Sequence, residues 1–162
     1  MSAQGSESEL IISGGRVVTP LEILEPGTVV VKGGKIAAIE EGASQSGDEG
    51  KVINAEGLTV APGLIDIHVH GAASHDTMDA TPEALEEMAL FFARHGVTSF
   101  LPTTMTASRE GILAAVENIA RCMEEGSDGA EILGVHLEGP YFNLEKKGAQ
   151  PASQIRPADP EE

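Results

Sequence analysis

The sequence predicts an α/β protein in which a small antiparallel β domain, residues 10–61, precedes the first three strand–helix units of a parallel (β/α)8 barrel, residues 62–162. Short β-branched runs separated by paired glycines fill the first part of the chain. Apolar strands alternate with amphipathic helices after Pro62. A closed eight-unit barrel needs roughly 250 residues. We therefore expect the barrel to be incomplete here, and the chain to be the N-terminal part of a longer protein.

Composition excludes several classes of function. The chain has 162 residues, and 26 acidic against 10 basic side chains give a formal net charge of −16, which disfavours nucleic acids and anionic membranes as partners. Its apolar runs are too short for a membrane-spanning helix. Residues 1–9 lack the pattern of a secretory signal and are predicted to be a flexible N-terminus. Cys122 has no second cysteine to pair with, so we expect a cytoplasmic protein.

The β domain is predicted from its glycine pairs. Gly14-Gly15 and Gly33-Gly34 each separate two β-branched runs, a pattern that favours tight hairpins. Residues 40–50 are rich in glycine, serine and acidic side chains and are predicted to form a solvated loop. The runs at 51–53 and 58–60 are expected to form a further pair of strands. Together these segments predict an antiparallel layer, part of a β-sandwich.

The second part of the chain alternates between strands and helices. Three apolar runs are predicted as strands, at residues 64–70, 97–101 and 132–137. Apolar residues recur at helical spacing over 83–95 and 109–125, and Thr81 and Ser108 precede these segments as candidate N-caps. Repeated strand–helix units imply parallel strands with the helices outside. The strands are almost wholly apolar, which indicates that both of their faces are covered.

The most informative stretch is Asp66-Ile67-His68-Val69-His70, at the end of the first predicted barrel strand. Alternate residues of a strand share a face, so Asp66, His68 and His70 point the same way. Two imidazoles two residues apart can share one divalent cation, and barrel active sites lie at the C-terminal strand ends. Asp66 is a candidate to orient one imidazole. The alternative, two buried histidines bonded to carbonyl groups, is weaker, because unpaired polar groups on a buried strand are costly.

A second polar pair, His136 and Glu138, ends the third predicted strand. By itself Glu138 would be interpreted as a loop carboxylate or a helix cap. Beside the first stretch, it is expected to reach the same centre as His68 and His70, and two histidines with one glutamate form a known open zinc arrangement. Such an ion would lower the pKa of a water molecule and polarise a substrate carbonyl. His136 is expected to contact substrate or to support the site.

Other polar residues have simpler interpretations. His75 is expected to be solvated, and His95 to lie at a helix end where a cation suits the dipole. Cys122 is predicted to pack beside the apolar stripe of its helix. The hydroxyl-rich segment 102–106 is interpreted as a turn at a strand end. None of these groups is predicted to carry chemistry.

Several stretches together carry a resemblance to a known family. The strand at 64–71 resembles the first barrel strand of the amidohydrolase superfamily. The segments Gly96-Val97-Thr98-Ser99-Phe100-Leu101-Pro102-Thr103, Gly134-Val135-His136-Leu137-Glu138-Gly139-Pro140-Tyr141-Phe142 and Lys146-Lys147-Gly148-Ala149-Gln150-Pro151 narrow the resemblance to the N-acetylglucosamine-6-phosphate deacetylases. The likeness extends from about Leu10 to the end of the chain.

The resemblance implies an amide hydrolase that removes acetate from N-acetyl-D-glucosamine 6-phosphate to give D-glucosamine 6-phosphate in amino-sugar metabolism. It implies one or two divalent metal ions per subunit, Zn or Fe. Glu138 matches a ligand of the catalytic ion, and His68 and His70 match the pair that holds a second ion in two-metal members. Ala149 and Gln150 match the segment that contacts the sugar; Gln150 stands where many relatives carry histidine.

The same resemblance implies that further metal-binding histidines and the catalytic aspartate come from later barrel strands. No histidine follows His136 in this sequence, so no catalytic residue is expected within it, and this chain alone is expected to be inactive. The full-length protein is expected to be a homodimer in which phosphate-binding groups often come from the partner subunit.

Three interpretations stay open at this point. The chain is either part of such a deacetylase or a truncated, non-catalytic product that binds a metal weakly. It is otherwise another amidohydrolase, acting on a cyclic amide; such enzymes usually lack the Glu138 segment and carry a metal-bridging modified lysine on a later strand.

Overall fold

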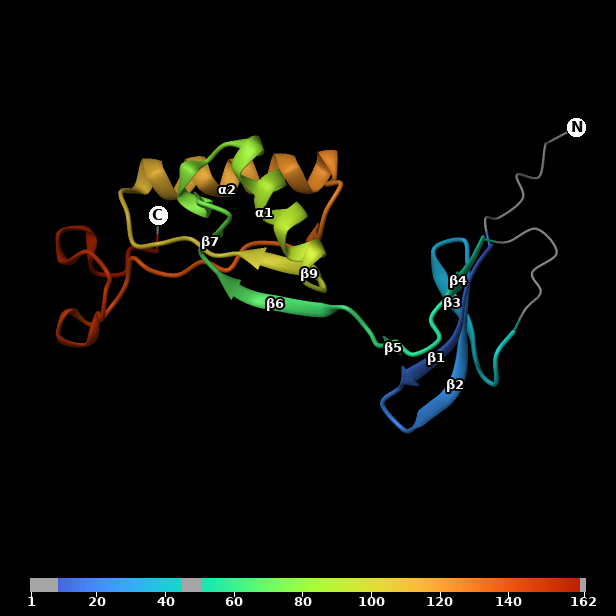
Figure 1. Ribbon diagram of the computed structural model, residues 1–162. Coiled ribbons are helices and arrows are strands. Elements are labelled where there is room, and N and C mark those ends of the chain that lie inside the picture. The colour runs from blue at the N-terminus through green and yellow to red at the C-terminus, as the bar shows by residue number, and fades with distance from the viewer. Residues whose placement is uncertain (1–8, 45–50, 161–162) are drawn as a thin grey trace, which may run out of the picture. The chain divides into compact units, whose positions relative to one another are not determined.

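A computed structural model describes residues 9–44 and 51–160 (Figure 1). The chain divides into two compact units, Met1–Pro62 and Gly63–Glu162. Most of the predicted flexible N-terminus (residues 1–8) and half of the predicted loop (residues 45–50) lie outside the described residues. Glu9, the last residue of that predicted N-terminus, begins the first strand.

The first unit is one mixed sheet. Its strands are β1 (Glu9–Val18), β2 (Ile23–Lys32), β3 (Lys35–Glu41), β4 (Lys51–Asn54) and β5 (Thr59–Val60). The order is β3-β2-β1-β4, with β5 also paired to β1. The β1–β2 and β2–β3 pairs are antiparallel, whereas β4 and β5 both run parallel to β1. The predicted all-antiparallel layer is therefore wrong for β4 and β5, which pair with β1 instead of with each other.

Only one of the two glycine pairs forms the predicted hairpin turn. Gly33-Gly34 forms the predicted hairpin between β2 and β3, and both glycines have positive φ. Gly14-Gly15 does not form one, because it lies inside β1, which has strand partners on both sides. Gly15 is needed there for another reason: a Cβ would come within 2.9 Å of the Ala55 Cβ. Close packing against this buried alanine, rather than a turn, accounts for the glycine.

The second unit is α/β, as the sequence predicts. Its main strands are β6 (Leu64–Val69), β9 (Val97–Pro102) and β10 (Glu131–Ile132), in the parallel order β10-β9-β6. Helices α1 (Pro82–Arg94) and α2 (Arg109–Glu125) cover the same face of this sheet (Figure 1). The minor elements are β7 (Gly71–Ala72), β8 (His75–Asp76) and the 3-10 helices η1 (Thr77–Asp79), η2 (Leu144–Lys146) and η3 (Ala152–Gln154).

Apolar stripes of both helices meet the sheet in one core. The buried cluster comprises Leu85, Met88, Ala89, Phe92, Phe100, Ile119, Cys122, Ala130 and Ile132. Phe100, on the central strand β9, is fully buried and its ring lies 4.8 Å from that of Phe92. The predicted caps are present: the Thr81 and Ser108 hydroxyls accept hydrogen bonds from the first-turn amides of Ala84 and Gly111. Val69, the last residue of β6, packs against this cluster.

The third predicted strand, residues 132–137, is much shorter in the structure. After β10 the chain continues beside β9, with Leu133 donating to the Phe100 carbonyl and His136 donating to the Pro102 carbonyl. The donors are three residues apart but the acceptors only two, so an extra residue bulges out of the ladder between them. Regular pairing therefore ends early, although the chain stays alongside β9 as far as a bridge between Thr103 and His136.

The expectation that both faces of the strands are covered is wrong for β6. It is an edge strand of its sheet, and Leu64, Ile65 and Ile67 are 60–64% exposed. Within the described ranges, neither α1 nor α2 is long and apolar enough to cross a membrane.

Candidate metal centre

Three predicted ligands converge at the C-terminal end of the parallel sheet. The Nε2 atoms of His68 and His70 lie 3.3 and 2.9 Å from the Glu138 Oε2 atom. One ligand atom from each of the three residues lies within 4.8 Å of the others. The imidazole ring centroids are 5.1 Å apart and nearly perpendicular. This is the only such group of potential ligands among residues 9–44 and 51–160.

Local structure explains the convergence. His68 is the fifth residue of β6 and His70 follows the strand directly, so their alternation brings both imidazoles to one side. Glu138 arrives on the segment that leaves β10 and runs beside β9. The next residue, Gly139, has a φ of 77°, and a Cβ there would overlap the Thr106 hydroxyl. Only glycine lets the chain turn so closely after Glu138.

The hydrogen bonds of the site leave lone pairs facing each other. His70 Nδ1 lies 3.1 Å from the Thr103 carbonyl oxygen. A carbonyl can only accept, so Nδ1 carries the hydrogen and the neutral ring presents a lone pair at Nε2. That lone pair faces Glu138 Oε2, a buried atom without a hydrogen-bond partner.

This donor set fits a divalent cation. A proton on His70 would satisfy one contact, whereas a metal ion accepts electron pairs from both imidazoles and the carboxylate together. A histidine ligand whose other ring nitrogen donates to a carbonyl is the usual arrangement in metal sites. The residues present therefore fit the ion that the sequence predicts.

His136 lies beside the group. Its ring centroid is 4.5 Å from that of His68, and its Nδ1 is 2.7 Å from the Ile67 carbonyl oxygen. By the same argument as for His70, Nδ1 donates and Nε2 is left as an acceptor. His136 is outside the group of three potential ligands, so it neighbours the candidate metal centre without belonging to it.

The remaining predicted site residues lie in different surroundings. Asp66 Oδ1 accepts a hydrogen bond of 3.0 Å from the backbone amide of His68, a contact with the backbone of that residue. Gln150 is buried, and its Oε1 accepts from the backbone amide of Thr106 at 3.0 Å. Ala149 is exposed. The structure thus brings His68, His70, Glu138 and His136 together, while the Gln150 amide supports the loop after β9.

Sequence reasoning overlooked Thr103 and Thr104. Both are fully buried at the end of β9 and hydrogen-bond to the two segments that carry the ligands. The signal in the sequence is a pair of hydroxyl groups at the C-terminal end of a predicted strand. The same pattern is typical of a turn.

Histidines outside the centre have other partners. His75 Nδ1 lies 3.8 Å from Asp79 Oδ2, and the His95 ring lies 4.2 Å from that of Phe91 and bonds to its carbonyl. Cys122 is buried in the core as predicted, and burial raises the pKa of its thiol from the ordinary value of 9.0.

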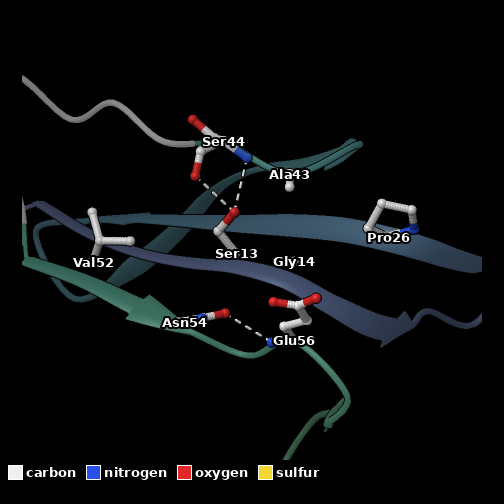
Figure 2. A pocket seen from close by; sticks show the side chains of 8 residues that line it. All are labelled: Ser13, Gly14, Pro26, Ala43, Ser44, Val52, Asn54 and Glu56. Atoms are coloured by element: carbon white, nitrogen blue, oxygen red, sulfur yellow. Dashed lines mark hydrogen bonds between the residues drawn. The ribbon is translucent and has the colours of Figure 1, made fainter.

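A separate pocket lies in the first unit. Its volume is about 570 Å³. Figure 2 shows the residues that line it. The Ser13 hydroxyl and the backbone of Ser44 hydrogen-bond to each other across it, and Asn54 accepts from the Glu56 amide. Among the described residues that line it, Glu56 has the only titratable side chain. The described lining residues therefore form no cluster of groups suited to catalysis.

Curated proteins with similar sequences are sugar-phosphate deacetylases. The chain is 45% identical over 127 residues to an N-acetylglucosamine-6-phosphate deacetylase of Vibrio furnissii, a match that covers 78% of this chain and 31% of the relative. It is 47% identical over 97 residues to an N-acetylgalactosamine-6-phosphate deacetylase of Escherichia coli O157:H7, covering 60% of this chain and 26% of the relative. The chain thus spans about a third or less of the length of these relatives.

A solved structure is similar to this chain over most of its length. The crystal structure of N-acetylglucosamine-6-phosphate deacetylase from Pasteurella multocida is similar with a TM-score of 0.85 and 30% sequence identity, over 94% of this chain and 40% of that one. The sequence profile of the Amidohydrolase family matches residues 59–162, which include all three metal-ligand candidates. This chain belongs to the amidohydrolase family.

Proposed function

We propose that this chain is part of a metal-dependent deacetylase that hydrolyses the acetamide of N-acetyl-D-glucosamine 6-phosphate, giving D-glucosamine 6-phosphate and acetate. The single observation that carries the proposal is the convergence of His68, His70 and Glu138 on one point, with an unpartnered Glu138 oxygen facing an imidazole lone pair. The names of the relatives supply the substrate class.

In this proposal His68, His70 and Glu138 hold the ion, which we propose to be Zn or Fe because imidazole and carboxylate ligands suit both. When bound, the ion would polarise the acetamide carbonyl and lower the pKa of a water molecule. His136, with Nε2 left as an acceptor, would hydrogen-bond the substrate. Ala149 and Gln150 are proposed to border the sugar, with the Gln150 side chain shaping the loop from within.

The proton-transfer group is proposed to lie outside these 162 residues. A carboxylate is needed to move a proton from water to the leaving amine, and within the described residues Glu138 is the only carboxylate in the cluster, where it acts as a ligand. We also propose that β6, β9 and β10 are the first strands of a closed barrel, and that the complete enzyme is a cytoplasmic homodimer.

A second substrate is favoured by one specific observation. The relative from E. coli O157:H7 is named for N-acetylgalactosamine 6-phosphate, and its identity to this chain, 47%, is as high as that of the glucosamine relative. The two sugars differ in the configuration of one hydroxyl group, so both are assayed as substrates.

The test uses a chimaera in which this chain replaces the matching segment of the V. furnissii deacetylase. We expect the chimaera to release acetate from N-acetyl-D-glucosamine 6-phosphate faster than from the galactosamine epimer, and to lose activity with a chelator. A Glu138→Ala chimaera is the inactive control. A folded chimaera that releases no acetate from either sugar would contradict the proposal.

The second candidate function is a metal-binding chain without catalysis of its own. It is favoured by the share of the relatives that the chain spans, 31% and 26%. Assay of the isolated 162-residue chain tests this second candidate, which predicts that the chain binds metal without releasing acetate. Turnover by this chain alone would exclude the non-catalytic reading.

A further inference from the structure

We propose that Thr103 and Thr104 are positioning residues, a buried clasp that fixes the two metal-binding segments relative to each other. This inference rests on the proposed metal centre but not on the identity of the substrate. The two threonines directly follow β9, hydrogen-bond to β6 and to the 136–138 segment, and are both fully buried.

Thr103 holds the histidine side of the centre. Its amide donates to the Val69 carbonyl at 2.8 Å, and its hydroxyl accepts from the Val69 amide at 2.9 Å while donating to the Leu101 carbonyl at 3.2 Å. Both backbone groups of Val69, the residue between the two histidine ligands, are therefore bound by one threonine. The Thr103 carbonyl also accepts from His70 Nδ1, which sets the tautomer and the orientation of that imidazole.

Thr104 holds the glutamate side. Its amide donates to the His136 carbonyl at 3.0 Å, and its hydroxyl accepts from the Glu138 amide at 3.1 Å. The hydroxyl also lies 3.5 Å from the Glu138 carbonyl oxygen, a long contact that adds little. The backbone on both sides of Leu137 is thus fixed by one residue. Thr103 and Thr104 are adjacent, so one rigid peptide unit links the hydrogen bonds to Val69 with those to the segment that carries Glu138.

The hydroxyl groups of Thr103 and Thr104 supply hydrogen bonds where the regular pairing beside β9 is interrupted. The ladder between β9 and the 132–137 segment is interrupted by a bulge, so strand hydrogen bonds alone do not fix the position of Glu138. Side-chain hydroxyls supply the missing bonds at that point. The Thr104 hydroxyl is buried, so no water replaces it as an acceptor if it is removed. Leaving the Glu138 amide without an acceptor would then cost the full desolvation free energy of that amide.

Thr106 supplies a matched control from the same loop. Its side chain is 3% exposed and its hydroxyl has no hydrogen-bond partner. Valine has nearly the shape of threonine, so Thr→Val changes the volume of the side chain little at either position 104 or position 106. At Thr106 the substitution removes no hydrogen bond. A difference between Thr104→Val and Thr106→Val therefore reports the bond to Glu138 and not the loss of a buried hydroxyl in general.

The test measures Co²⁺ and Zn²⁺ affinity of the 162-residue chain by competition with a chromophoric chelator. We expect Thr104→Val to weaken binding roughly 10- to 100-fold, as loss of an outer partner of a metal ligand does, and to change the visible spectrum of bound Co²⁺. Thr104→Ser keeps the hydroxyl and should restore affinity to within about threefold of wild type. Thr106→Val should leave affinity and spectrum unchanged.

Two further measurements separate positioning from general stability. In a Glu138→Gln background, Thr104→Val should cause no additional loss of affinity, because Thr104 acts through Glu138. Hydrogen exchange on the unsubstituted, metal-free chain needs no variant: the Glu138 and Val69 amides should already be protected. Rapid exchange of the Glu138 amide would overturn the clasp even if Thr104→Val failed to fold.

The outcomes distinguish this inference from the proposed function. Equal metal affinity in Thr104→Val and wild type, or equal losses in Thr104→Val and Thr106→Val, would overturn the clasp while leaving the metal centre intact. Failure of the unsubstituted chain to bind any metal would overturn both. A chain that binds metal in the expected order but belongs to an enzyme with another substrate would support the clasp and contradict only the deacetylase proposal.

Discussion

At the scale of single residues, the direction of one hydrogen bond determines the chemistry of the site. The Thr103 carbonyl forces the His70 proton onto Nδ1, which turns the Nε2 lone pair toward a carboxylate oxygen that also has only lone pairs to offer. A proton on His70 Nε2 would satisfy only this 2.9 Å contact, whereas a metal ion would be bound by both atoms and by His68 Nε2 together. The arrangement is therefore understandable as the metal-free form of a metal site.

The histidines offer a matched test of this reading. His70→Asn should weaken Zn²⁺ binding by more than roughly 100-fold, since loss of an outer partner alone costs roughly 10- to 100-fold. His95→Asn is the control, because His95 also bonds a carbonyl through Nδ1 but lies against Phe91 at the end of α1. Metal content after equilibrium dialysis measures both. Equal loss in the two variants would contradict the assignment of His70.

Cys122 gives a prediction that depends on pH. Burial raises the pKa of its thiol in the folded chain, so the folded state favours the neutral form. The resulting stability is fully present below the unfolded-state pKa and is lost as the pH rises through the higher folded-state pKa. We expect the free energy of unfolding to fall above about pH 9 more steeply in wild type than in Cys122→Ala, measured by urea titration. Parallel pH dependence in the two would refute this origin.

The sequence was most informative for residues whose role follows from alternation along a strand. His68, His70 and Glu138 could be placed on shared faces from spacing alone, and the structure brings their ligand atoms together. Gln150 could not be placed, because its partner, the Thr106 amide, is 44 residues away in the chain. The role of Thr103 and Thr104 could not be predicted for the same reason. Hydroxyl groups at strand ends are common in turns, and the hydrogen-bond partners of these two residues lie on other segments.

At the scale of elements, the helices follow local rules closely. The second helix begins and ends where periodicity and its serine cap predict, at Arg109 and Glu125. The sheet follows rules that are not local. Gly14-Gly15 could not be recognised as part of β1, because partners on both sides, one of them more than forty residues later, keep the strand extended. The bulge before His136 likewise depends on where β9 presents its carbonyls.

The cap of α2 gives a prediction at this scale. The Ser108 hydroxyl accepts from the Gly111 amide at 3.2 Å, so Ser108→Ala should lower the free energy of unfolding by about 1 kcal/mol. Ser108→Asp retains a capping oxygen and adds a negative charge at the helix N-terminus, and should match wild type or exceed it. Chemical denaturation followed by circular dichroism is the measurement. A Ser108→Ala variant as stable as wild type would show that the cap contributes nothing.

At the scale of the whole molecule, the described chain presents an apolar edge. β6 pairs with β9 on one side only, and Ile65 and Ile67 on this strand are 60% and 64% exposed. A hydrophobic edge strand with unpaired backbone groups is a template for association. The sequence predicts an incomplete barrel, and the share of the relatives that this chain spans is in keeping with that expectation.

We predict that the 162-residue chain self-associates in a concentration-dependent manner, and that Ile65→Lys shifts it toward monomer. Leu21→Lys is the control, since Leu21 is 94% exposed in the other unit and lies off this edge. Sedimentation velocity over a range of concentrations measures the effect. Wild type that stays monomeric at high concentration, or a Leu21→Lys variant that dissociates equally well, would argue against the edge as the cause.

The proposed metal centre is one ion held by side chains from the end of β6 and from the segment beside β9. X-ray absorption spectroscopy of the Zn²⁺-loaded chain tests this most directly. We predict one equivalent of Zn²⁺ with imidazole nitrogens at about 2.0–2.1 Å, and loss of that signal in Glu138→Gln. A bound ion with no imidazole ligand, or a spectrum unchanged by Glu138→Gln, would contradict the account.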